Sequence, residues 1–179
     1  MRSTAIPWLF AGEARAWAAL GNATRAKELI ERAERAREQA QPDELDSLGG
    51  VCTFSQPRQL YYAARAFACI PDESHLAERY STQAVDAYRD STQPDWDFTC
   101  QADSRLSLAL SRAARELDGV ADSLQPVFDL SPECRIHDLV NTMNLVHRML
   151  NRFAGDAEAR NLQEAIETFT RDSLPRFPV

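Results

Sequence analysis

The feature that most constrains this chain is the spacing of its apolar residues, which recur at three and four positions and are interrupted by glycine or proline. In residues 6–20 and 23–40 these residues lie on one helical face, and Gly21 separates the two segments. Asn22 is suited to cap the second segment, because its side chain can accept a hydrogen bond from the first helical turn. The pattern therefore predicts a helical hairpin over residues 6–40.

Three further hairpins are expected over residues 57–90, 98–130 and 135–170, after a long loop at residues 41–56. Ser74 and Asp97 are suited to cap helices within them. No segment shows the sustained period-two alternation of a strand. The hairpins begin at intervals of about 40 residues, which is a repeat length typical of an αα-solenoid. We therefore expect residues 1–179 to form a single all-α domain of about four hairpins, or eight helices.

Composition limits the class of partner. The 179 residues carry a net charge of −7 without a visible basic cluster, which argues against binding nucleic acid. No apolar run is long enough to span a bilayer, and no signal peptide is visible, so a cytoplasmic protein is expected. The four cysteines lack the spacing of zinc ligands, and no metal or cofactor is expected. We expect all four to be buried free thiols rather than disulfides: Cys52, Cys69, Cys100 and Cys134.

The first hairpin resembles a tetratricopeptide repeat, because small, aromatic and turn residues stand at that family's positions: Ala14, Trp17, Gly21, Ala26, Ile30 and Ala33. Residues 42–64 and 117–136 are similar to the C-terminal half of actinobacterial helix-turn-helix (XRE-type) regulators that carry a tetratricopeptide region. Their DNA-binding domain precedes this region, whereas the present sequence begins at the repeat itself, so we expect either a fragment of such a regulator or a stand-alone relative. The resemblance thus implies sensing or protein binding without transcriptional output. An N-terminal hairpin with no upstream neighbour would expose Trp8 and Phe10 to a partner or a second copy.

A polar stripe marks the seventh expected helix, with spacings of 4, 3, 4 and 3: His137, Asn141, Asn144, Arg148 and Asn151. Asparagine offers paired donor and acceptor groups, which suit the backbone of an extended peptide. On neighbouring inner helices, Tyr61, Tyr62, Arg65, Gln101 and Arg105 would extend this groove, with arginine clamping a carboxylate. The alternatives are a solvated face for the stripe, core packing for the tyrosines and structural ion pairs for the arginines.

These features favour a non-catalytic binding module, a regulatory sensor or adaptor for a peptide, a protein segment or a small effector. A rival hypothesis is an assembly protein that forms a homodimer through the first hairpin. A third is an enzyme that uses His137 or His147 as a general base. The two histidines are 10 positions apart and point to different sides of their helix, so joint metal binding is not expected.

Overall fold

The computed structural model describes residues 3–44 and 46–173, and within them it contains eight α-helices and no strand. The prediction of an all-α chain is therefore confirmed. The helices run in chain order, with short 3-10 turns between several of them: α1 Ala5–Ala19, α2 Ala23–Glu38, α3 Gln56–Ala68, α4 Ser74–Ala87, α5 Phe98–Ala113, α6 Val120–Phe128, α7 His137–Leu150 and α8 Ala157–Ser173.

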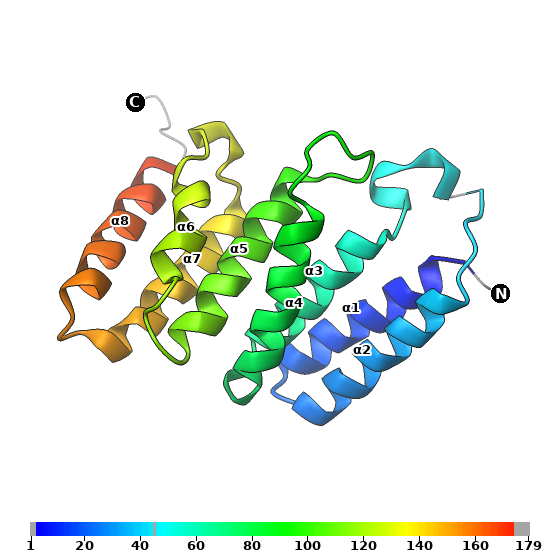
Figure 1. Cartoon of the computed structure of the whole chain (residues 1–179), viewed down its shortest axis with the longest axis horizontal. Coiled ribbons are helices and arrows are strands. Elements are labelled where there is room, and N and C mark those ends of the chain that lie inside the picture. Colours follow the sequence, from blue (N-terminus) through cyan, green and yellow to red (C-terminus); the bar gives the residue numbers. More distant parts are fainter. Residues whose placement is uncertain (1–2, 45, 174–179) are drawn as a thin grey trace, which may run out of the picture.

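Successive helices pack in pairs, and the pairs follow one another in a row (Figure 1). Each odd-numbered helix contacts the even-numbered helix that follows it, and α1, α3, α5 and α7 also pack against one another in sequence. The apolar core is divided along this row. One cluster joins the first four helices through residues such as Leu29 and Phe67, and a larger one joins the last four through Leu106, Met143 and Ile166.

Local signals explain several helix ends. Gly21 has a φ of 78°, which a residue with a side chain rarely adopts, and the Asn22 side chain accepts a hydrogen bond from the Arg25 amide at 3.0 Å. Asp97 caps α5 through the amides of Thr99 and Cys100, as predicted. Ser74 does not cap the fourth helix as predicted. A 3-10 turn at Pro71–Glu73 leads directly into α4, so Ser74 is already its first helical residue.

The long loop between α2 and α3 is fastened to the helices. It contains 3-10 turns at Asp46–Leu48 and Gly50–Cys52 and then buries Phe54 completely. The Phe54 ring stacks on Trp8 at 5.9 Å and meets the Tyr62 ring edge-on at 5.3 Å. Arg37 donates hydrogen bonds to the Phe54 carbonyl and, at 2.8 Å, to the Gln59 side chain. This loop thereby helps to set the position of α1 against α3.

The thiols are only partly as expected. All four cysteines are free, which confirms the absence of disulfides among them. Cys100 alone is buried, whereas Cys69 is exposed and Cys52 and Cys134 are intermediate, so the expectation of four buried thiols was wrong. Cys69 follows the last residue of α3, where the chain turns outward before α4.

Within residues 3–44 and 46–173, no helix combines the length and the apolar character that crossing a membrane requires.

Candidate functional site

The odd-numbered helices form the walls of two adjoining cavities. The first holds about 450 Å³ between α1 and α3, and the second about 490 Å³ where the ends of α1, α3, α5 and α7 meet. Ala19 and Cys69 line both cavities, so the two adjoin, and together they are here called the inner groove. Its walls comprise Trp8, Gly12, Arg15, Ala16, Ala19, Tyr62, Arg65, Ala68, Cys69, Pro71, Leu110, Leu145, Arg148 and Met149.

Small residues keep the first cavity open. Gly12, Ala16 and Ala19 recur at spacings of 4 and 3, which places them on one face of α1, and all three line the cavity. A Cβ atom added to Gly12 would meet no other atom within 4 Å. The neighbouring face of α1 carries Ala11, Ala14 and Ala18, which are buried in the core. The helix therefore uses one small-residue stripe for packing and another for the groove.

Arginines give the first cavity a positive wall. The Arg15 guanidinium lies over the Tyr62 ring, 4.7 Å from its centroid, and 5.9 Å from the centroid of Tyr61. Arg65 places its Nε 3.0 Å from Oδ2 of Asp103, which also accepts a hydrogen bond from the Tyr61 hydroxyl at 3.1 Å. One carboxylate thus faces two guanidinium groups, which leaves an excess of positive charge in a chain whose net charge is −7.

The Asp103 carboxylate is the most deeply placed charge beside the groove. Its residue is 3% exposed, and Oδ1 has no hydrogen-bond partner among the described residues. Burial raises the pKa of the Asp103 carboxyl, and the nearby Arg65 acts in the opposite direction. The Nη1 atom of Arg65 is likewise buried without a hydrogen-bond partner in the described part of the chain. Both Nε and Nη1 of Arg65 are therefore enclosed beneath the groove surface, where they offset the charge of Asp103.

The second cavity is apolar at its base and charged at its rim. Leu110 of α5 is 5% exposed, and Leu145 of α7 is 37% exposed. Met149, with its flexible thioether, adds an adaptable apolar surface. Arg148 is exposed at the edge. The inner groove thus offers a cationic end between α1 and α3 and an apolar end toward α7.

The structure brings together only part of the predicted site. Arg65 and Arg148 both line the inner groove, whereas Tyr61 turns its hydroxyl to Asp103 and adopts the structural role given as its alternative. Burial raises the pKa of the Tyr61 phenol. The ion pair of Arg65 likewise matches the structural alternative, although the residue also forms part of the groove wall.

Tyr62 also lines the first cavity, whereas Arg105, His137, Asn141 and Asn144 line neither cavity. Arg105 lies near Arg89, a residue of the α4–α5 connection. Burial lowers the pKa of the Arg105 guanidinium, and the positive charge of Arg89 lowers it further. His137 and Asn141 are exposed on α7, and Asn144 is half-buried there. His147, considered above as a general base, points to α8, where Nε2 lies 3.2 Å from Oε1 of Glu167.

The first hairpin does not present the predicted apolar side chains. Trp8 is half-buried and donates its indole N–H to the Tyr62 hydroxyl at 3.1 Å, and Phe10 lies under the Arg32 guanidinium at 4.2 Å. Leu9 and Leu20 are the large apolar residues exposed near this helix, at 69% and 77%. Sequence reasoning also missed Arg15 and the small-residue stripe of α1. The 12, 16, 19 spacing of that stripe was the available signal.

Nowhere in the described residues do three or more His, Cys, Asp or Glu side chains come together in a way that could hold a metal ion. Comparison of the sequence with family models, curated proteins and solved structures gives no significant match.

Proposed function

We propose that this chain is a non-catalytic binding module of the tetratricopeptide-like type, which acts as a regulatory sensor or adaptor. Its ligand is a peptide, a protein segment or a small effector held in the inner groove. The pairwise packing of successive helices, with the odd-numbered helices in contact, supports the repeat interpretation. A cytoplasmic location and a relation to actinobacterial regulators remain predictions from the sequence.

The observation that carries this proposal is that the two cavities of the groove adjoin. Because Ala19 and Cys69 belong to both cavities, one extended ligand can reach the cationic end and the apolar end together. Guanidinium groups bind carboxylates through directed, charge-assisted hydrogen bonds. Leu110, Leu145 and Met149 offer an apolar seat across the groove. The matching ligand carries an anionic group beside an apolar side chain.

The test uses the exposed thiol of Cys69 as a reporter of occupancy. Short peptides that combine leucine with a free C-terminal carboxylate are compared with the same peptides as C-terminal amides. We expect the carboxylates to slow alkylation of Cys69 by N-ethylmaleimide, and the amides to slow it less. Cys52, which does not line the groove, serves as the internal reference.

A matched pair of variants locates the binding. Ala16 is exposed in the groove wall, so Ala16→Glu adds a negative charge there with little effect on packing, and Ala16→Gln adds similar volume without charge. We expect Ala16→Glu to abolish the protection and Ala16→Gln to keep most of it. Equal protection by carboxylate and amide, or an unchanged response in Ala16→Glu, would contradict the proposal.

Native mass spectrometry of gently purified protein adds an unbiased measurement. A retained small mass that disappears in Ala16→Glu identifies the ligand directly. A retained mass that persists in this variant places binding outside the inner groove.

The rival hypothesis, a homodimer formed through the first hairpin, draws on the exposure of Leu9 at 69%. Leu9→Glu tests it without disturbing the packed Trp8 ring. Sedimentation equilibrium should show a smaller assembly for Leu9→Glu if α1 forms the interface, and an unchanged mass counts against it. A catalytic role for His137 or His147 stays a prediction, and neither residue lines the inner groove.

A further inference from the structure

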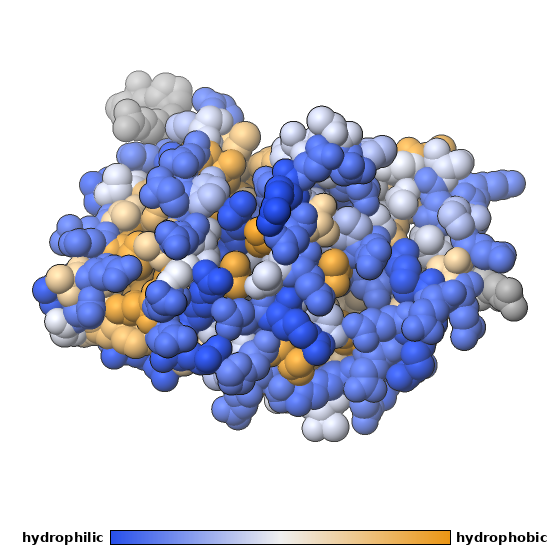
Figure 2. All heavy atoms as spheres, in the orientation of Figure 1, coloured by the Kyte–Doolittle hydropathy of each residue, from blue (hydrophilic) through white to orange (hydrophobic). Residues whose placement is uncertain are grey.

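A second hollow lies between α6 and α8, on surfaces that do not contribute to the inner groove. It holds about 560 Å³ and is lined by Gln125, Phe128, Arg135, Asn161, Glu164, Ala165, Thr168, Phe169 and Asp172. Figure 2 shows apolar atoms gathered between these two helices in an otherwise largely hydrophilic face. We call this hollow the α6–α8 groove.

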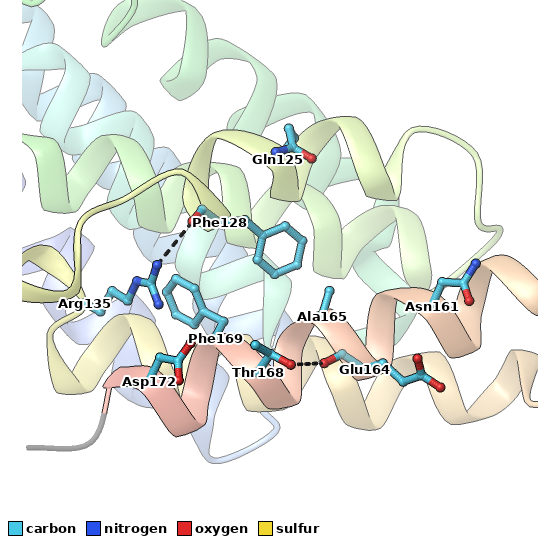
Figure 3. Close-up of a pocket in the computed structure, with 9 residues that line it drawn as sticks. All are labelled: Gln125, Phe128, Arg135, Asn161, Glu164, Ala165, Thr168, Phe169 and Asp172. Carbon is cyan, nitrogen blue, oxygen red and sulfur yellow. Dashed lines mark hydrogen bonds between the residues drawn. The ribbon is translucent and has the colours of Figure 1, made fainter. Parts of the chain in front are cut away.

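The corresponding helix pairs earlier in the chain are bridged by polar side chains, and a smaller hollow of about 280 Å³ also lies beside the first of these bridges. Between α2 and α4, the Tyr80 hydroxyl donates to Glu34 at 2.7 Å. Between α4 and the start of α6, Arg112 of α5 forms the bridge: it donates to Glu78 of α4 at 3.2 Å and to the carbonyl of Gly119, which precedes α6, at 2.8 Å. Between α6 and α8, the Phe128 and Phe169 rings meet at 6.1 Å, and the rest of the hollow stays open (Figure 3).

The α8 wall has the length and periodicity of a helix-binding surface. Asn161, Ala165, Thr168 and Asp172 recur at spacings of 4, 3 and 4, and they lie along one face toward the groove (Figure 3). The stripe extends over about 17 Å, or three helical turns. The half-buried Phe128 and Ala165 contribute apolar surface at its centre, above the buried Phe169 ring. An amphipathic helix that lays one face into a groove uses such an arrangement.

The groove wall carries two carboxylates, Glu164 and Asp172, and one arginine, Arg135, and the two helices that flank it are acidic overall. Together α6 and α8 carry five carboxylates and two arginines: Asp122, Glu158, Glu164, Glu167 and Asp172, with Arg160 and Arg171. Within the described residues, the lining carboxylates Glu164 and Asp172 have no ion-pair partner.

Arg135, the cation in the groove wall, is held by the chain itself. Its Nε donates to the Leu130 carbonyl at 2.9 Å, and its guanidinium lies 4.4 Å from the centroid of the Phe169 ring. Arg135 is therefore engaged in contacts within its own chain at one end of the groove. The carboxylates of Glu164 and Asp172 stay available to a cationic side chain of a partner.

We propose that the α6–α8 groove is a docking site for a basic amphipathic helix of a protein partner. The apolar face of this helix packs on Phe128 and Ala165, and its lysine or arginine side chains pair with Glu164 and Asp172. A second copy of this chain is the poorer occupant, because the two acidic grooves would face each other. The proposal is independent of the ligand in the inner groove.

The probe is a fluorescent helical peptide of about four turns, with leucines along one face and two lysines at the spacing of Glu164 and Asp172. A second peptide carries glutamate in place of each lysine. We expect fluorescence anisotropy to show at least tenfold tighter binding of the lysine peptide to the wild-type protein. Comparable binding of both peptides overturns the proposal.

A charge exchange identifies the site. Glu164→Lys with Asp172→Lys should reverse the preference, so that the glutamate peptide binds more tightly. The control, Glu38→Lys with Glu44→Lys, makes the same change in net charge at exposed positions outside this groove and should keep the wild-type preference. Reversal by the control as well, or no reversal by the groove variant, refutes docking between α6 and α8. Circular dichroism verifies that both variants keep their helix content.

Discussion

Two glycines of this chain should respond in opposite directions to the same substitution. Gly12 lies inside α1 with a helical backbone, and its added methyl group would meet no atom within 4 Å. Glycine costs about 0.8–1.0 kcal/mol relative to alanine within a helix, because it loses more backbone freedom on folding. Gly12→Ala should therefore raise the free energy of unfolding by about 1 kcal/mol, and Tm by about 2–4 °C for a chain of this size.

Gly119 is the matched contrast. It precedes α6 with a φ of 68°, a left-handed conformation that costs a residue with a Cβ about 1–2 kcal/mol. An added Cβ would also collide with the Arg112 side chain, which donates to the Gly119 carbonyl and to the Ser123 hydroxyl. Loss of those hydrogen bonds adds about 1 kcal/mol. Gly119→Ala should thus lower the free energy of unfolding by about 2–3 kcal/mol, the sum of these two costs.

Urea denaturation followed by circular dichroism measures both effects in one assay. A lower free energy of unfolding for Gly12→Ala would contradict the inference that space is open beside α1. An unchanged free energy of unfolding for Gly119→Ala would contradict the inference of a left-handed turn before α6. The same methyl group at Gly12 enters the inner groove, so Gly12→Ala should combine higher stability with weaker protection of Cys69 by a ligand. Undiminished protection would argue that the ligand does not reach this part of α1.

Three further results are expected. Burial, aided by a hydrogen bond to Glu34, raises the pKa of Tyr80 to about 12, above the value of about 10 in an unfolded chain. Its stabilising effect is complete below about pH 10 and is lost as the pH rises toward 12, so Tm should fall between about pH 10 and 12, with a smaller slope in Tyr80→Phe. Limited alkylation read by peptide mass spectrometry should modify the exposed Cys69 first and Cys100 last, because burial raises the pKa of the Cys100 thiol to about 11. Phe54→Ala should lower the free energy of unfolding by about 3–5 kcal/mol in urea titrations, because this ring is completely buried; a loss below about 1 kcal/mol would show that the loop does not hold α1 and α3.

The helices were predictable because their signals are local. Spacings of three and four positions place apolar residues on one helical face, and caps such as Asn22 and Asp97 depend on amides only a few residues away. The fourth helix shows the limit of this reasoning. Ser74 has the right side chain for a cap, but the 3-10 turn at Pro71–Glu73 sets the backbone first and makes it helical.

The candidate site was less predictable because side-chain type does not reveal which neighbour a residue meets. Arg65 and Arg148 were singled out from the sequence and do line the inner groove. Arg15 was missed, although it lies over two tyrosine rings contributed by another helix. Trp8 and Phe10 were expected to be exposed, but a distant aromatic ring and an arginine of α2 partly cover them.

The sequence by itself determined that the chain is helical, where most of its helices begin and end, and that its surface is acidic, because each of these follows from nearby residues or from composition. The tertiary structure decided which helical faces adjoin. The packing of α1, α3, α5 and α7 places two cavities next to each other and pairs Arg65 with Asp103. The arrangement of α6 and α8 leaves a second groove between them. Those contacts join residues far apart along the chain, so no local pattern could specify them.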